Sequence, residues 1–216
     1  MLASGAMFEL DHVILGVVDL PAASARLRTD LGLASVEGGR HVGVGTGNRI
    51  VPLGRNYVEV LAVADPEEAR AHPFGRWVLD YLGGRERFLG WCLRTDGLDV
   101  IAKRLGLEIE AWSRERPDGA VLRWRMAGLD VAMKDPSLPF FMEWEIEDDL
   151  YPGRTRAAHA AEPKGFAWVE VAGDAERLAA WIGPADLPMR VVEGDPGIRA
   201  AGIRLGVSEA VLRPAP

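Results

Sequence analysis

The stretch FELDHVILGVVDL, residues 8–20, decides the fold together with NYVEVLAV, residues 56–63. Both are rich in β-branched and aliphatic residues, which predicts two strands. Each carries one metal-capable side chain in an apolar run, His12 in the first and Glu59 in the second. Burying such a group is costly unless it is paired or bound to a cation, so two of them on neighbouring strands suit a metal or acid–base site. The alternative is that His12 is a core histidine with a partner of its own and that Glu59 faces solvent.

Composition narrows the class of protein. The chain has 216 residues, 48% hydrophobic and 26% charged, which is enough for a core in one or two domains. Its net charge of −7 argues against a nucleic-acid partner and against binding to an anionic membrane surface. The single cysteine, Cys92, excludes a disulfide framework and favours a reducing cytoplasm. Residues 1–7 lack the features of a signal peptide and are expected to form a loose N-terminal tail.

The first part of the chain predicts a β-α-β-β-β unit. A helix follows Asp19, with Pro21 in its first turn, and ends near Leu31 with Gly32 as its cap. The glycine-rich stretch GGRHVGVGTGN, residues 38–48, joins two strands and is not followed by Lys-Ser/Thr, so it is not a phosphate-binding loop. The predicted strands of this unit are 8–18, 34–37, 49–53 and 57–63.

The same order of elements then recurs twice at nearly equal intervals, if His12, Trp91 and Trp168 are set equivalent. Such regularity favours internal duplication. The predicted fold class is α+β, with tandem βαβββ modules that form a curved-sheet cup and a third, shorter βαβββ-like repeat. The predicted boundaries are 8–64 for module one, 65–85 for a helical connector, 86–147 for module two, 148–164 for a linker or lid, and 165–214 for the partial third module.

The motifs identify a family resemblance that covers roughly residues 8–213. LDHVILGVVDL followed by an alanine-rich helix and YVEVLAV resembles the vicinal oxygen chelate superfamily, which contains glyoxalase I, extradiol dioxygenases and bleomycin-resistance proteins. GGRHVGVGTGN, HPFGRWVLD, FLGWCLRT and LPFFMEW resemble its glyoxalase-like branch more closely. The resemblance implies paired modules around a cup. In members with metal, it also implies one His or Gln and one Glu from each module as ligands of a divalent ion.

Carried onto this sequence, the resemblance places His12 and Glu59 at the ligand positions of module one and Glu143 at the last-strand position of module two. Trp91 occupies the remaining position and cannot bind a metal. A His/Glu/Glu set suits Mn, Fe, Ni or Zn, with Glu59 and Glu143 also available as catalytic carboxylates. Alternatively, a metal-free cup lined by Trp91 would bind a flat or apolar ligand.

Further substrate-binding candidates come from the second module. Arg123 and Arg125 alternate with apolar residues, so both arginines either point into the cup, where they could clamp a carboxylate, or lie on a solvated outer face. Phe141, in LPFFMEW, and Trp91 are the aromatic candidates.

Three functions remain open from the sequence. The first is a divalent-metal-dependent lyase, isomerase or dioxygenase that acts on a small oxygenated metabolite. The second is a metal-free protein that binds or sequesters a small molecule, as bleomycin-resistance proteins do. The third is a scaffold whose cup is filled by its own side chains or by another subunit, and a homodimer is compatible with all three.

Overall fold

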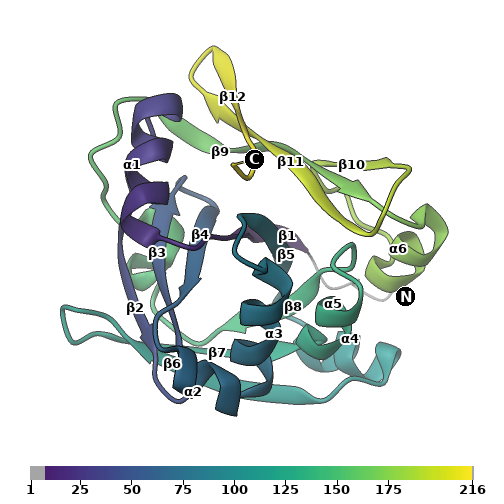
Figure 1. The fold of residues 1–216 in the computed structure, drawn as a ribbon. Coiled ribbons are helices and arrows are strands. Elements are labelled where there is room, and N and C mark those ends of the chain that lie inside the picture. Colours follow the sequence, from purple (N-terminus) through teal and green to yellow (C-terminus); the bar gives the residue numbers. More distant parts are fainter. Residues whose placement is uncertain (1–7, 216) are drawn as a thin grey trace.

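The computed structural model describes residues 8–215, so the expected tail at residues 1–7 lies outside the described residues. Two sheets and six helices make up this part of the chain (Figure 1). The strands are β1 Glu9–Gly16, β2 Val36–His41, β3 Thr46–Pro52, β4 Tyr57–Val63, β5 Arg87–Arg94, β6 Ile109–Glu115, β7 Val121–Ala127, β8 Phe140–Trp144, β9 Pro163–Ala172, β10 Met189–Val192, β11 Gly197–Leu205 and β12 Ser208–Leu212. The helices are α1 Leu20–Leu31, α2 Pro66–Ala71, α3 Pro73–Leu82, α4 Leu98–Leu105, α5 Leu129–Lys134 and α6 Ala175–Ile182.

Local sequence explains the helix of module one. Asp19 caps α1 because its side chain accepts a hydrogen bond from the backbone N–H of Ala22 at 2.8 Å. Pro21 lies in the first turn, where its missing N–H costs nothing. Gly32 ends the helix with a left-handed φ of 68°. The predicted start, cap and end of this helix are confirmed.

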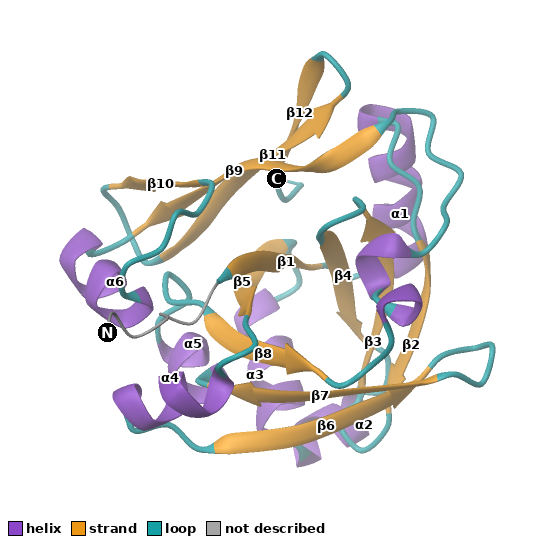
Figure 2. Ribbon diagram, turned by 180° about the vertical axis from the view of Figure 1, so that it is seen from behind, coloured by secondary structure: helices purple, strands orange, loops and turns teal. Residues whose placement is uncertain are grey.

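Eight strands form one strongly curved sheet in the order β2-β3-β4-β1-β5-β8-β7-β6 (Figure 2). β1 pairs in parallel with β4 and antiparallel with β5, and β5 pairs in parallel with β8, so the two modules meet at the β1–β5 pair. The two edges nearly close the sheet, since Arg114 on β6 donates a hydrogen bond to Asn48 on β3, beside the edge strand β2. This is the tandem βαβββ cup that the sequence predicts.

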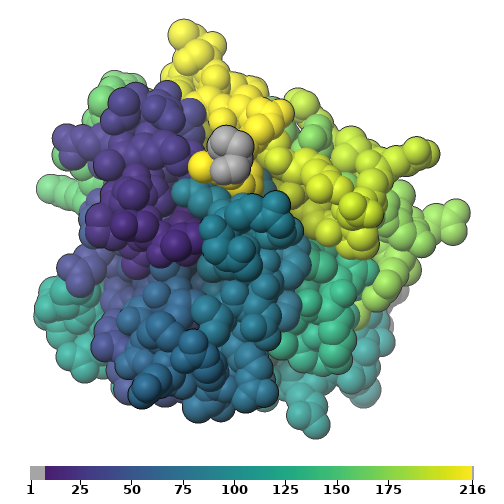
Figure 3. Space-filling view, viewed as in Figure 1, coloured from purple at the N-terminus to yellow at the C-terminus, as the bar shows by residue number. Residues whose placement is uncertain are grey.

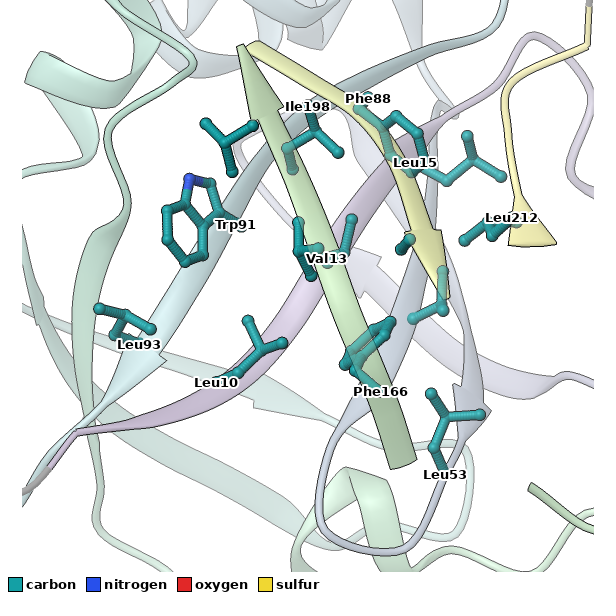
Figure 4. Packing of buried hydrophobic residues seen from close by; sticks show 14 of the residues in the cluster. Leu10, Val13, Leu15, Leu53, Phe88, Trp91, Leu93, Phe166, Ile198 and Leu212 are labelled. Atoms are coloured by element: carbon teal, nitrogen blue, oxygen red, sulfur yellow. The ribbon is translucent and has the colours of Figure 1, made fainter. Parts of the chain in front are cut away.

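The third repeat forms a separate four-stranded sheet in the order β10-β9-β11-β12, and α6 follows β9. Its inner face packs on the convex face of the eight-stranded sheet, where Phe166, Val169 and Ile203 meet Val13 and Trp91 in one cluster (Figure 4). The third repeat is therefore a β-α-β-β-β unit, and it buries the back of the cup.

The connector between modules is helical, as expected for residues 65–85. It contains two helices, α2 and α3, because His72 is extended and Pro73 begins the second helix. Phe74, Val78 and Leu82 on α3 pack against cup-facing residues of both modules. Part of the connector lies on the face of the molecule shown in Figure 3, and α3 packs against the inner face of the cup. Within residues 8–215, none of the helices has both the length and the apolarity that crossing a bilayer demands.

Candidate functional site

A cavity of about 610 Å³, including its open mouth, remains inside the cup. Its polar groups gather on the module-one side and come from β1, β2, β3, β4 and the opposite edge strand β6. They are His12, His41, Asn48, Tyr57, Glu59 and Arg114. The apolar lining residues are Ile14, Ile50, Leu61, Phe74, Trp112, Trp124, Met126, Leu129, Phe140, Met142 and Trp144.

His12 is held in place by the residue that precedes it. Asp11 is fully buried, and its Oδ1 lies 2.7 Å from His12 Nδ1. The other oxygen, Oδ2, accepts hydrogen bonds from Trp144 Nε1 at 3.0 Å and from the Tyr151 hydroxyl at 3.1 Å. Because a carboxylate can only accept, Nδ1 carries the imidazole proton. In its neutral form His12 therefore presents the lone pair of Nε2 to the cavity.

Glu59 is held from the opposite side by a second chain of contacts. Asn48 Nδ2 donates to Glu59 Oε1 at 2.5 Å, and Asn48 Oδ1 accepts from Arg114 Nη1 at 3.0 Å. Gly38 makes this contact sterically feasible, because a Cβ there would lie 2.0 Å from Asn48 Oδ1 and 2.6 Å from Arg114 Nη1. The glycine-rich stretch thus permits close approach of side chains at the seam of the cup.

Two acceptor atoms face each other across the cavity floor. Glu59 Oε2 lies 3.7 Å from His12 Nε2, and neither atom has a hydrogen-bond partner among residues 8–215. Tyr57 stacks on the imidazole with ring centroids 4.7 Å apart. Burial, reinforced by Asp11 and Glu59, raises the pKa of Tyr57 well above its usual value, so its hydroxyl stays protonated. The floor therefore offers two acceptors and one neutral donor.

The aromatic candidates Trp91 and Phe141 lie outside the cavity. Trp91 is 1% exposed, pairs with Val13, and points to the convex side, towards β9 and β11 (Figure 4). Its indole N–H donates to Ser137 O at 3.0 Å. Phe141 is fully buried in the same cluster. Their predicted location in the cup is wrong, because the β8 side chains that line the cavity belong to the alternate residues Phe140, Met142 and Trp144, and no β5 residue lines it.

The charged candidates of module two also lie on the outer side of the sheet. Glu143 Oε2 accepts a hydrogen bond from Arg125 at 2.6 Å, and Arg125 also binds Asp99 at 2.9 Å. Arg123 is exposed, and none of Arg123, Arg125 and Glu143 lines the cup. Glu143 consequently does not join His12 and Glu59, and the outer-face alternative for the two arginines is the correct one.

Strand register shows which residues of module two correspond to the ligand positions. His12 pairs with Tyr57 on β4 and with Cys92 on β5, whereas Cys92 pairs with Phe140 on β8. Glu59 lies two residues beyond Tyr57, so its counterpart lies two residues beyond Phe140, at Met142. The equivalent of His12 is thus Cys92 and not Trp91, and the equivalent of Glu59 is Met142 and not Glu143.

A divalent ion fits the His12–Glu59 pair better than the other group of potential ligands. Asp11, His12 and Cys92 bring ligand atoms within 4.8 Å of one another, the one such group of three among the described residues. Both Asp11 oxygens already accept hydrogen bonds, however, and burial raises the pKa of the Cys92 thiol well above its usual value. A metal needs the thiolate. His12 Nε2 and Glu59 Oε2, in contrast, are free, and a carboxylate on the other imidazole nitrogen is the usual arrangement behind a metal-binding histidine.

Sequence reasoning missed three residues of this site: Asp11, Asn48 and Arg114. Asp11 is the one with a clear sequence signal, because a second acidic residue inside an apolar strand and directly before His12 requires buried donors. Asn48 ends the glycine-rich stretch, and Arg114 lies in the charged run SRERPD, which reads as solvated. Nothing in either segment indicates contact across the seam between modules.

Comparison with known proteins gives a family. Residues 10–185 match the family described as glyoxalase-like domain. A hypothetical protein from Staphylococcus aureus aligns at 18% identity and a TM-score of 0.65, over 96% of this chain and 85% of that one. Methylmalonyl-CoA epimerase from Mycobacterium tuberculosis aligns at 21% identity and a TM-score of 0.48, over 69% of this chain and 95% of that one. No curated protein sequence matches. The chain therefore belongs to the glyoxalase-like domain family.

Proposed function

We propose that this protein is an isomerase or lyase that moves a proton on a small carbonyl-containing substrate held in the cup. The observation that carries the proposal is the free Oε2 of Glu59, which faces an oriented His12 at the floor of a mostly apolar cavity. A fixed carboxylate with one unoccupied oxygen is suited to act as a general base. Asn48 holds the other oxygen, so the free one keeps its direction towards the substrate.

The same two residues are the candidates to hold the divalent ion, Mn, Fe, Ni or Zn, that the resemblance implies, in which case Glu59 Oε2 would bind the ion and would no longer be free to act as the base. When bound, such an ion would polarise a substrate carbonyl. Asp11 fixes the tautomer of neutral His12 in which Nε2 carries the lone pair, and Asn48 limits Glu59 to a single free oxygen. Module two supplies Cys92 and Met142 in place of a second ligand pair, so affinity for a hard cation should be modest.

Among the reactions that the resemblance implies, proton transfer requires only the base that this cup contains. An iron-dependent dioxygenase typically requires three protein ligands on one side of the metal, and the cup brings together two. Proton transfer is therefore the reaction that the side chains support best. The single cysteine is buried, which agrees with a cytoplasmic location for this activity.

The test is exchange of carbon-bound hydrogen in D₂O. Wild-type protein would be incubated with small carbonyl compounds, with and without Mn, Fe, Ni or Zn, and loss of the proton next to the carbonyl followed by NMR. We expect exchange that Glu59→Gln abolishes and that Glu143→Gln leaves unchanged, because Glu143 lies outside the cup. Equal loss in both variants, or full activity in Glu59→Gln, would contradict the proposal.

A second candidate function is metal-free binding of a small molecule, and a specific observation favours it. The module-two residues equivalent to His12 and Glu59 are Cys92, a protonated thiol, and Met142, a thioether. The adjoining walls of the cup are aromatic or aliphatic. Such a cup would retain an apolar ligand without chemistry. Saturable binding that Glu59→Gln leaves intact, without any hydrogen exchange, would support this alternative.

A further inference from the structure

Arg114 is a buried charge with no ion-pair partner among residues 8–215. Arg114 is 7% exposed. It lies on β6, at the edge of module two that meets module one. No carboxylate oxygen of the described residues lies within 4.0 Å of it. Arg94, which is also largely buried, instead pairs with Glu9 and Asp11.

The guanidinium uses little of its hydrogen-bonding capacity within the protein. Nη1 donates to Asn48 Oδ1, and the described residues provide no other side-chain acceptor. A guanidinium has five N–H donors in a fixed planar fork. Arg114 lines the cup and also a second hollow at the seam, beside Glu37 and Asp118, so its side chain is accessible to a molecule in the cup. Burial lowers the pKa of Arg114, with partial compensation from Glu59 beyond the amide. An added anion would relieve this cost of burial.

We propose that Arg114 binds a carboxylate of the ligand and that the cup therefore selects apolar or aromatic carboxylic acids. This inference rests on the proposed function, because that function places the reacting end of the ligand at Glu59. Two N–H groups of a guanidinium match the two oxygens of a carboxylate. Trp112, Trp124 and Phe74 supply flat, apolar walls for the rest of the molecule.

The charge of the cup favours a carboxylate over a phosphate ester. Arg114 is the one permanently positive side chain that lines it, and Glu59 contributes a negative charge beyond Asn48. Burial lowers the pKa of His41, so this imidazole is neutral at pH 7 and adds no second cation. The charges of Arg114 and Glu59 already cancel, so a bound monoanion adds one excess negative charge beside Glu59, whereas a dianion adds two.

The position of Arg114 also indicates where the carboxylate lies on the ligand. A single carboxamide, that of Asn48, separates the guanidinium from the carboxylate of Glu59. A ligand bound to Arg114 therefore places the atoms next to its carboxylate near His12 and Glu59. The predicted substrate is an acid whose reacting carbon is close to its carboxylate, with an apolar or aromatic group at the other end.

The experiment compares three probes of one shape by isothermal titration calorimetry: benzoate, benzamide and phenyl phosphate. The wild-type protein should bind benzoate about tenfold or more tightly than benzamide, as a charge-assisted bidentate contact provides, and more tightly than phenyl phosphate. Arg114→Met should reduce the benzoate-to-benzamide ratio to about one while leaving benzamide affinity unchanged. Arg125→Met, which removes an arginine of the outer face, is the matched control and should keep the wild-type ratio.

Absence of a benzoate preference in the wild type, or its persistence in Arg114→Met, would overturn the inference. So would tighter binding of phenyl phosphate. If Arg114→Met does not fold, Arg114→Lys replaces it: a single ammonium should retain only part of the preference, and a full one would contradict the bidentate role. Glu59→Gln should lose hydrogen exchange but keep the benzoate preference. Failure of the proposed function and failure of the carboxylate site are thereby distinguished.

Discussion

Asp11 should be the most sensitive polar residue of the protein. It is fully buried and accepts hydrogen bonds from three separate donors, on His12, Trp144 and Tyr151. Hydrogen bonds to a charged group contribute about 1.5–3 kcal/mol each, against roughly 0.5–1.5 for neutral ones. Asp11→Asn keeps the shape but loses the charge and turns an NH₂ group towards one donor. We expect it to lower the free energy of unfolding by about 2–4 kcal/mol, and Asp11→Ala by about 4–5 kcal/mol.

Urea unfolding at pH 7, followed by circular dichroism, measures both losses. Asp30→Asn, on the exposed face of α1, is the matched control and should change stability by less than about 0.5 kcal/mol. A second readout concerns His12: without the carboxylate its preferred tautomer reverses, and any affinity of the cup for a divalent ion should fall roughly 10- to 100-fold. A cost below about 1 kcal/mol for Asp11→Asn would refute the view that this carboxylate organises the floor of the cup.

Three further predictions follow from neighbouring contacts. Gly38→Ala would place a methyl group 2.0 Å from Asn48 Oδ1 and should cost about 1–3 kcal/mol in urea unfolding, whereas Gly47→Ala, with nearest contacts of 3.4 Å, should be close to neutral. The buried thiol of Cys92, whose pKa is raised, should resist iodoacetamide at pH 8 until the protein unfolds, and rapid labelling of native protein would contradict this. Burial lowers the pKa of His41 below 6.5, so the unfolded chain binds more protons and stability should fall as pH drops below 6.5; His41→Asn should flatten this slope, and an unchanged slope would count against it.

The order of elements was predictable because each signal is local. The Asp19 cap, Pro21 and Gly32 define α1 without reference to the rest of the chain, and the alternation of β7 is visible in its sequence. The connector was predicted only as helical, and its division into α2 and α3 at His72–Pro73 depends on a short extended segment that propensity alone does not reveal. Boundaries of this kind depend on tertiary packing.

The site was harder to predict because neighbouring residues of a strand face opposite sides of the sheet, so an error of one residue assigns a side chain to the wrong side. Equating Trp91 with His12 instead of Cys92 moves every inferred contact of β5 to the opposite face. The same error of one residue assigned the last-strand position to Glu143 instead of Met142. The pairing between β1 and β5 is also irregular, and counting residues along the chain does not reveal the resulting shift in register. Arg114 and Asn48 meet across the seam between two modules, about 66 positions apart in sequence, so no local pattern links them.

The central claim is that His12 and Glu59, without help from module two, form the reactive centre of the cup. A crystal structure of wild-type protein soaked in Mn²⁺ and measured for anomalous scattering tests it most directly. The account predicts one peak in the cup, about 2.0–2.3 Å from both His12 Nε2 and Glu59 Oε2, and none beside Glu143. A peak bound by Asp11 and Cys92, a peak at Glu143, or an empty cup at a saturating Mn²⁺ concentration would contradict it.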